Sequence, residues 1–513
     1  MIKKFTFIVT LIFICLFGPL VAYADVGDTG FFGGISEGRR LLKTTEMLLA
    51  NRSPQTNFIY KETVFLTGNP VVFEGILIKS PTVILPESEN LGSYTESYRV
   101  TANATTRPEA VIERAIVFNV NWRRVGQQII KDYTVSTWNE TILAADADGN
   151  IILHTIDPLQ SYFYISIIED RPAAVTYYRG DISQRAVYTT DAGEDAGGTT
   201  LEGAGSFYGY SCAWSNTETH RIDYMIYTDD WQMQYQVRPS VSVNKTLQYT
   251  PNEPTVISFP GNYKEVMENI SGLNWDIYIK PQIFYTAPDN GIANITINNT
   301  FEQLIAPNLS FLRGHFAEGD IAKLFALQVL DGEPTYYRPE QAITRGQFVT
   351  ALVKAIRLPV TIPTTRTART RIPTTPITFP DITQSNPEYP YIMAAYRAGI
   401  AVGRSNGYFY AESPIERQEA FVMVLRALGL ENLGYDPLPI TAFTDDADIE
   451  TWAKRELYAA ERIGLISGDT DGNLSPKTLV SKAEAAALLI RLIEYMRVDL
   501  KTDYADHIVH YPN

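Results

Sequence analysis

Apolar and polar positions change their spacing along the chain, and the change separates a strand-like part from a helical part. Between residues 55 and 305 the two kinds of side chain tend to alternate, and residues 231–237 alternate strictly, as in a half-buried strand. After residue 311, apolar residues such as Ile321, Leu324 and Phe325 recur at helical spacing. The pattern predicts a mainly antiparallel β region followed by an all-α C-terminal module.

Short polar stretches predict where the strands reverse. Residues 67–70, Thr-Gly-Asn-Pro, form one such turn, and Asp148-Gly149-Asn150 and Asn290-Gly291 form two more. Residues 191–209 are rich in Gly, Ala and Asp and predict a long exposed loop. Strands and turns of this kind indicate one large sandwich or two smaller ones.

The N-terminus has the pattern of a secretory signal. Lys3 and Lys4 precede an apolar run that ends before the small-x-small site of residues 22–24. Removal of residues 1–24 would leave Cys212 as the sole cysteine, which suits an exported bacterial protein without an internal disulfide. A short helix is predicted over residues 36–51, with Ser36 as its N-cap.

Composition excludes several functions. The formal net charge of −15 argues against nucleic acid as a partner, so any anion site requires a local cluster of cations. No apolar stretch after the signal is long enough to span a bilayer. Retention at a surface therefore has to come from another part of the chain.

The helical part contains a threefold internal repeat. A glycine follows each first helix, and a cation opens each second helix 13, 14 or 14 residues later. A proline lies between them in each repeat. The glycines are Gly332, Gly403 and Gly468, the prolines Pro339, Pro414 and Pro476, and the cations Arg345, Arg417 and Lys482.

Each repeat predicts a helix, a turn and a second helix. The glycine suits a left-handed helix end, and Thr344-x-x-Gln347 and Ser481-x-x-Glu484 are capping boxes, with a weaker version starting at Glu416. A cation beside a helix N-terminus is unfavourable by some tenths of a kcal/mol. Three cations at equivalent positions therefore favour an anion pocket made of the cation and the first helix amides, although solvated side chains remain an alternative.

This pattern resembles the S-layer homology family. The motif pieces are Phe379-Pro-Asp381 with Gly399-Ile-x-x-Gly403, Phe443-Thr-Asp445 with Trp452-Ala453, and Ile343-Thr-Arg345. The resemblance covers residues 311–495 and implies a three-pronged helical spindle with ligand grooves between repeats. It also implies non-covalent binding to a secondary cell-wall polysaccharide that bears ketal-linked pyruvate.

The resemblance also implies which residues bind the wall polysaccharide. They are the three motif cations, the early aspartates Asp381 and Asp445, the aromatic Trp452, and the three repeat glycines. The repeats depart from the motif in three ways: Leu309 replaces the first aspartate, Pro387 replaces the second aromatic, and Lys482 replaces the third arginine. Because lysine lacks the bidentate fork of arginine, one groove is expected to be weak or empty.

No other motif points to catalysis or a metal. No phosphate loop, zincin motif or nucleophile elbow is present. The Asp469-x-Asp471-Gly472-Asn473 stretch resembles the start of a calcium loop, but the turn of the repeat explains it. We therefore expect no cofactor and no enzymatic activity. The expected function is that of a surface protein on a bacterial cell wall, with self-assembly into a layer as an expected partner interaction.

Two alternatives remain for the β region. A wall-anchored enzyme acting on polysaccharide would show a cleft with two carboxylates about 5–10 Å apart. A carbohydrate-binding adhesin would expose aromatic platforms, with Trp122, Trp138, Trp214, Trp231 and Trp275 as candidates, although core packing is the simpler role for them.

The predicted order of parts is as follows: signal peptide 1–24, N-terminal segment 25–54, β-rich ectodomain 55–305, first repeat 311–358, Pro/Thr/Arg-rich loop 359–378, second repeat 379–430, third repeat 443–495, and tail 496–513.

Overall fold

The structure is a computed structural model that describes most of the chain. The described residues are 30–44, 55–81, 83–86, 88–145, 149–191, 198–250, 262–281, 288–360, 379–404, 406–434 and 437–504. The predicted signal peptide and almost all of the Pro/Thr/Arg-rich loop lie outside them. Among the described residues, none of the helices combines the length and apolar character needed to cross a membrane.

The β region forms a single antiparallel sheet. Its strands are β1 (Ile35–Ser36), β2 (Asn57–Val64), β3 (Val71–Lys79), β4 (Leu91–Ala104), β5 (Val111–Val125), β6 (Gln128–Ala145), β7 (Ile151–Ile156), β8 (Tyr162–Asp170), β9 (Val175–Thr190), β10 (Gly198–Cys212), β11 (Ser215–Tyr227), β12 (Gln232–Thr250), β13 (Asn262–Ile279), β14 (Asn290–Thr296) and β15 (Thr300–Ile305). Neighbours in sequence pair in order, except that β7 and β8 both lie between β6 and β9, and β15 pairs with β13.

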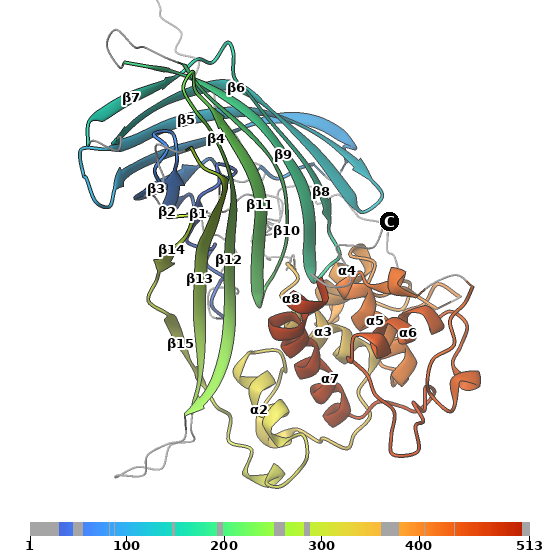
Figure 1. Cartoon of the computed structure of the whole chain (residues 1–513). Helices are drawn as coiled ribbons and strands as arrows, with labels where there is room; N and C mark the ends of the chain where they lie inside the picture. Colours follow the sequence, from blue (N-terminus) through green and yellow to red (C-terminus); the bar gives the residue numbers. More distant parts are fainter. Residues whose placement is uncertain are drawn as a thin grey trace, which may run out of the picture.

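The sheet curls so strongly that its two ends meet (Figure 1). Strand β14 lies beside β2, and the Lys61 ammonium donates to the Asn294 carbonyl at 2.9 Å. The expectation of one or two sandwiches was therefore wrong. Alternation shows that one face of each strand is buried, but it does not show what covers that face. Here the right-handed twist of long strands lets a single sheet enclose its own apolar face.

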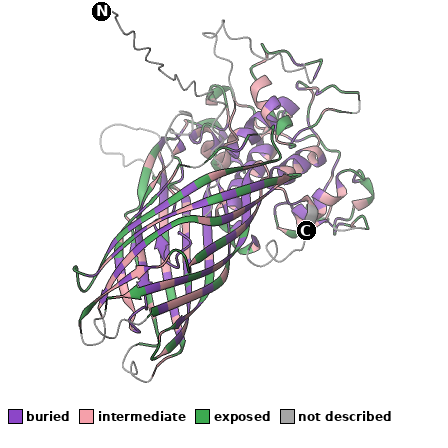
Figure 2. Ribbon diagram, turned by 90° about the horizontal axis from the view of Figure 1, so that it is seen from above, coloured by how far each residue is buried: buried purple, intermediate pink, exposed green. Residues whose placement is uncertain are grey.

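Alternation along the strands is confirmed. Figure 2 shows buried and exposed positions following each other along the strands. In β4 the buried side chains are Glu96, Tyr98, Val100, Ala102 and Ala104, whereas their sequence neighbours face solvent. The interior therefore holds one large apolar core. The outer face is polar along most of β4 but carries exposed apolar side chains on other strands, such as Ile76 on β3 and Ile292 on β14.

The predicted turns had mixed outcomes. Residues 67–70 reverse the chain between β2 and β3, with Gly68 at φ +79°. Strands β6 and β7 pair around the Asp148 turn, whose residues 146–148 lie outside the described part. The Asn290-Gly291 prediction was wrong because both residues begin β14. A Cβ on Gly291 would lie 2.3 Å from Trp275, so this glycine makes room for the tryptophan ring.

The predicted loop over residues 191–209 was also wrong in its second half. Residues from Gly198 onward form β10, while 192–197 lie outside the described part. The small residues of this strand make room for rings on neighbouring strands: a Cβ would lie 2.5 Å from Tyr224 at Gly203 and 2.5 Å from Tyr178 at Gly209. Glycine in a strand can thus indicate a close neighbour rather than a loop.

The N-terminal segment does not begin with the predicted helix. Ser36 is fully buried in β1 and pairs with Tyr60 of β2, so it is not an N-cap. Residues 37–43 are not helical, and residues 45–54 lie outside the described part. The apolar stripe of this segment instead contributes Leu41 to a small core with Val243 and Met267.

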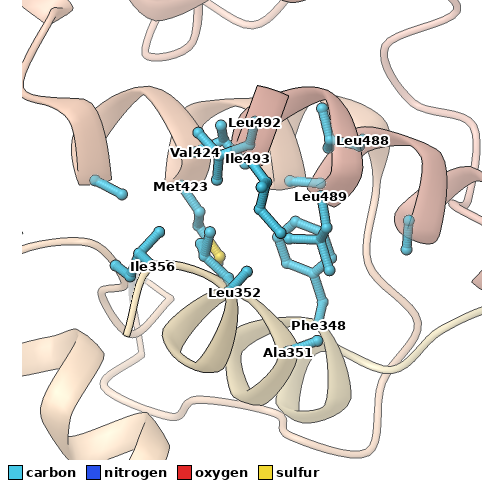
Figure 3. Packing of buried hydrophobic residues seen from close by; sticks show 14 of the residues in the cluster. Phe348, Ala351, Leu352, Ile356, Met423, Val424, Leu488, Leu489, Leu492 and Ile493 are labelled. Atoms are coloured by element: carbon cyan, nitrogen blue, oxygen red, sulfur yellow. The ribbon is translucent and has the colours of Figure 1, made fainter. Parts of the chain in front are cut away.

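The C-terminal part consists of three helix pairs. They are α2 (Glu318–Ala326) with α3 (Arg345–Ala355), α4 (Tyr389–Arg397) with α5 (Arg417–Leu428), and α6 (Lys454–Arg462) with α7 (Lys482–Glu494). The three pairs bury their apolar faces in one shared core. Figure 3 shows Phe348, Leu352 and Met423 converging on Leu489 and Ile493.

This core continues into the sheet, and the helices lie at one end of it (Figure 1). Trp214 is fully buried there and donates from Nε1 to the Ala355 carbonyl at 2.8 Å. Residues 496–504, expected to form part of the tail, instead extend the last helix through η7 (Tyr495–Asp499) and α8 (Leu500–Asp503). Tyr504 is buried and donates to the Tyr178 carbonyl at 2.7 Å. The helical module and the sheet therefore share one core.

The left-handed position after each first helix differs from the one predicted. It is occupied by Gln328, Gly399 and Gly464, with φ of +58°, +73° and +68°. Of the repeat glycines, only Gly332 has a positive φ, at +91°. A Cβ on Gly403 would lie 2.9 Å from Phe379, and one on Gly468 would lie 3.0 Å from Gly472. Gly403 and Gly468 are therefore required because neighbouring atoms leave too little room for a side chain.

Replacing Gln328 with glycine is expected to stabilise the protein by about 0.5–1 kcal/mol, because a left-handed conformation is strained for a residue with a Cβ. Gly464→Ala at the equivalent position of the third repeat should destabilise it by a similar amount. Urea unfolding of both variants checks this pair, and a loss of stability in Gln328→Gly would contradict it.

Candidate functional site

The three repeats are joined in a closed ring of backbone hydrogen bonds just before their second helices. Ile343 N donates to Val480 O at 2.9 Å, Val480 N to Ile415 O at 3.0 Å, and Ile415 N to Ile343 O at 3.2 Å. Each repeat thus meets the other two. We call the contact of the first repeat with the second the first junction, of the second with the third the second junction, and of the third with the first the third junction.

The helix amides expected to take part in an anion pocket are already occupied. The first amide of each second helix donates to the next repeat: Arg345 N to Ser413 O at 2.8 Å, Arg417 N to Thr478 O at 2.9 Å, and Lys482 N to Gln341 O at 2.9 Å. The third amides of α3 and α7 donate to Thr344 and Ser481 within the predicted capping boxes. The amides therefore join the repeats and cap the helices, and the cations stand apart from them.

The second amide of each second helix shows that the predicted alignment of the three prolines is not the structural one. Gln418 N donates to Pro476 O and Ala483 N to Pro339 O, whereas Gly346 N donates to Ala411 O. The structural equivalent of the two prolines is therefore Ala411, and Pro414 lies three residues beyond it.

At the first junction Arg345 is buried. Its side chain reaches into the second repeat, where Nη1 lies 2.9 Å from Glu419 Oε1 and Nη2 lies 2.9 Å from the Val402 carbonyl. The guanidinium also lies over the ring of Phe409, at 5.0 Å from its centroid. Burial lowers the pKa of Arg345, and the Glu419 carboxylate acts in the opposite direction.

The second junction repeats this arrangement in a more open setting. Arg417 forms an ion pair with Glu484 of the third repeat and donates to the Leu474 carbonyl at 3.1 Å. Burial alone would raise the pKa of Glu484, but hydrogen bonds from Ser481 and Arg417 outweigh it and lower that pKa. The cost of a cation at the start of a helix is thus offset by a carboxylate at both junctions.

The third junction lacks this ion pair. Lys482 Nζ donates to Gln341 Oε1 at 2.9 Å and lies 5.9 Å from the centroid of the Tyr337 ring. Glu419 and Glu484 each lie two residues after the motif cation of their repeat. The equivalent residue of the first repeat is Gln347, which is neutral and exposed. In the described part of the chain, Lys482 forms no ion pair with a carboxylate.

The two predicted aspartates hold loops that the arginines also contact, at Phe409 beside Arg345 and at Leu474 beside Arg417. Asp381 accepts hydrogen bonds from Phe409 N at 2.9 Å and Tyr410 N at 2.6 Å, and so holds the loop of its own repeat. Asp445 does the same for Leu474 N and Ser475 N, at 2.8 and 2.7 Å. In the first repeat Leu309 is buried at this position. Trp452 is 48% exposed on the surface of the third repeat.

Sequence reasoning did not identify the carboxylates that pair with the cations. Glu419 and Glu484 were recognised only as capping residues, and both do cap their helices. The sequence did contain a signal for the ion pairs, because each of these glutamates lies two residues after a motif cation. The partner of each cation, however, belongs to a different repeat, and sequence spacing does not show that contact.

The described part of the chain contains no group of three or more His, Cys, Asp or Glu side chains suited to a metal ion. In the stretch that resembles a calcium loop, Asp469 Oδ1 accepts hydrogen bonds from Asp471 N and Asn473 N, both at 2.9 Å. This carboxylate is therefore engaged in the turn.

The interior of the sheet contains two carboxylates around one arginine. Arg114 donates from Nη1 to Glu62 Oε2 at 2.8 Å and from Nη2 to Glu140 Oε1 at 2.7 Å. A cavity of about 40 Å³ lies beside them. Because each water needs about 10–15 Å³, the cavity has room for only a few waters and is too small for a sugar ring. These carboxylates therefore do not form the open cleft that a glycosidase needs.

The tryptophans of the β region pack in the core. Trp122, Trp138, Trp214 and Trp275 are all at most 5% exposed, and only Trp231 is partly exposed. They do not form the row of exposed aromatic platforms that an adhesin of the predicted kind would show.

A carboxylate with a perturbed pKa lies at the first junction. Glu388 Oε2 occupies the space that a side chain on Gly346 would fill, at 1.8 Å from the ideal Cβ position. Burial, followed by the nearby Glu412 and Asp331, raises the pKa of Glu388 to about 7. The folded protein thus favours the protonated form of this group.

This shift predicts a pH dependence of stability. Because the folded pKa lies above the unfolded value of 4.5, the folded state binds more protons, and stability should fall as pH rises from about 4.5 to about 7. Glu388→Gln should flatten this part of the curve, whereas Glu333→Gln, which changes an exposed carboxylate, should not. Urea unfolding measured from about pH 5 to about pH 8 checks this pH dependence. Parallel curves for Glu388→Gln and the parent would refute the assignment.

Comparison with known proteins identifies the repeats. The family model of the S-layer homology domain matches residues 312–349, 378–421 and 442–486. The predicted resemblance and its threefold repeat are therefore confirmed.

Relatives of two kinds match the chain, S-layer proteins and polysaccharide-degrading enzymes. The chain is 29% identical over 180 residues to S-layer protein EA1 of Bacillus anthracis, a match that covers 34% of this chain and 19% of the relative. It is 23% identical over 362 residues to Exoglucanase XynX of Acetivibrio thermocellus, covering 69% of this chain and 30% of the relative. It is 26% identical over 218 residues to Amylopullulanase of Thermoanaerobacterium thermosulfurigenes, covering 40% of this chain and 11% of the relative. The chain thus spans less than a third of the length of these relatives.

One expectation is overturned by these relatives. The chain was expected not to be an enzyme, but relatives named as an exoglucanase and an amylopullulanase contradict that expectation. The predicted location at the cell surface is confirmed by the S-layer homology domains together with the S-layer protein.

Proposed function

We propose that this cell-surface protein is held non-covalently on a secondary cell-wall polysaccharide by its three S-layer homology repeats and presents the curled sheet outward. The observation that carries the proposal is the threefold match to the S-layer homology domain. The structure supports it, because the three repeats form one closed ring and therefore act as a single module. A pyruvate-bearing polymer suits the cations at the junctions, since a carboxylate can accept a charge-assisted hydrogen bond. Self-assembly into a surface layer is part of the same proposal.

Sedimentation with wall sacculi tests this function. The full mature chain should sediment with sacculi from a Gram-positive bacterium that carries pyruvylated secondary polymer. It should stay in solution after that polymer has been extracted, because the peptidoglycan that remains lacks the ligand. Equal sedimentation with both preparations would contradict binding to the secondary polymer.

A second candidate is an enzyme that acts on polysaccharide, with its site in the β region. It is favoured by the match to the exoglucanase, which extends over 362 residues and is therefore longer than the helical part of this chain. The cavity at Glu62 and Glu140 is too small for a sugar, so a substrate would have to bind elsewhere on the sheet. Release of reducing sugar from soluble glucans and pullulan by the purified chain tests this candidate, and no release above a boiled control would count against it.

A further inference from the structure

The three junctions differ in whether their motif cation is already neutralised. Arg345 and Arg417 each form an ion pair with a carboxylate of the next repeat. An acidic ligand at either junction would have to compete with a carboxylate that is attached to the protein and held in place by helix capping. Such a competitor has a high effective concentration, which lowers the apparent affinity for a ligand in solution.

The third junction has a cation without such a competitor. Lys482 meets the neutral amide oxygen of Gln341 and the Tyr337 ring. Gln347, at the position of the competing carboxylate, is neutral and exposed. Its amide oxygen accepts a hydrogen bond from Thr344 N, at 3.4 Å, and thus contributes to the helix cap.

The surroundings of this junction add positive charge. Arg338, the residue after Tyr337, is exposed and donates to the Tyr337 carbonyl at 3.3 Å. In the described part of the chain it forms no ion pair with a carboxylate. Glu340 is the nearest acidic residue in sequence, and its carboxylate is bonded to His315 Nε2 at 2.8 Å. Lys482 itself is half-buried, and this burial lowers its pKa.

We propose that the acidic group of the wall polysaccharide binds at the third junction, to Lys482 beside Tyr337 and Gln341, and that the glutamine at position 347 keeps this site open. The inference rests on the proposed wall-anchoring function and selects one of three grooves within it. It reverses the order expected from the motif alone, in which the lysine made the third groove the weak one. The ammonium donates to the ligand carboxylate, and the half-buried Tyr337 ring lies beside the bound sugar.

Three full-length variants test the inference by moving the competing carboxylate. Gln347→Glu places at the third junction the carboxylate that the other two junctions have, and should weaken binding to pyruvylated sacculi about ten- to hundredfold. Lys482→Gln should weaken it by a similar factor. Glu484→Gln removes the competitor from Arg417, keeps a capping side chain like that of Gln347, and should leave binding equal to or tighter than the parent's.

Two controls separate binding from folding. All three variants should melt within a few degrees of the parent, because none removes a buried partner. Acid treatment that hydrolyses the pyruvate ketal should reduce parent binding to the level of Lys482→Gln.

The outcomes are distinguishable. If Gln347→Glu and Lys482→Gln bind as tightly as the parent, the third junction is not the site, although wall anchoring stands. If Glu484→Gln loses binding as strongly as Lys482→Gln, the competing role of the carboxylate is refuted. If the parent itself does not bind sacculi, the proposed function fails, and this inference fails with it.

Discussion

Replacing Trp214 with alanine is expected to lower the free energy of unfolding by about 3–5 kcal/mol, the usual cost of removing a fully buried tryptophan. Trp214 lies where the strands meet the helices, and its Nε1 donates to the Ala355 carbonyl at 2.8 Å. Lys245 and Arg357 lie over its ring, at 5.4 and 5.5 Å from the centroid. The substitution would therefore remove core contacts, the donor to the Ala355 carbonyl, and the ring over which the two cations lie.

Urea unfolding followed by far-ultraviolet circular dichroism measures this effect. Trp452→Ala is the matched control, because Trp452 is 48% exposed and its loss should change stability by less than about 1 kcal/mol. Equal effects of the two substitutions would show that the sheet and the helical module do not depend on a shared core.

Replacing Arg345 with alanine is expected to cost about 3 kcal/mol of stability. Arg345 is 4% exposed, and its removal takes the cation at the first junction away from the Glu419 carboxylate, whose side chain is only 12% exposed. Removing one partner of a buried ion pair typically costs about 3–5 kcal/mol. We expect the lower end of this range because Arg404, at 3.4 Å from the same carboxylate, remains as a second partner.

Lys482→Ala is the matched control, since it changes the equivalent cation of the third repeat. Lys482 is half-buried and has a neutral partner, so its removal should cost less than about 1 kcal/mol. Thermal melting of both variants gives the comparison. A melting temperature of Arg345→Ala within a degree or so of the parent would show that the cation is not part of the fold.

The clearest correct predictions concerned contacts between residues close together in the sequence. The capping boxes at Thr344 and Ser481 span four residues, and both are present. Alternation predicted strands with one buried face, as β4 shows, and the repeat spacing predicted three helix pairs. These features depend on side chains a few residues apart, which sequence patterns record directly.

Predictions failed where distant parts of the chain meet. A two-residue period does not distinguish a sandwich from a sheet that encloses its own face. Gly291 suggested a turn, but it makes room for Trp275, which lies on another strand. The partner of Arg345 is Glu419, 74 residues away, so the charge state of the candidate site became clear only from the structure.

The central claim is that the repeats bind an acidic wall polysaccharide, and calorimetric titration of the full mature chain with a soluble, pyruvylated polysaccharide fragment tests it most directly. The account predicts saturable binding that disappears when the pyruvate is removed and is weakened by Gln347→Glu. No saturable heat at ligand concentrations up to about 1 mM, where binding free energies weaker than about −4 kcal/mol would escape detection, would contradict it.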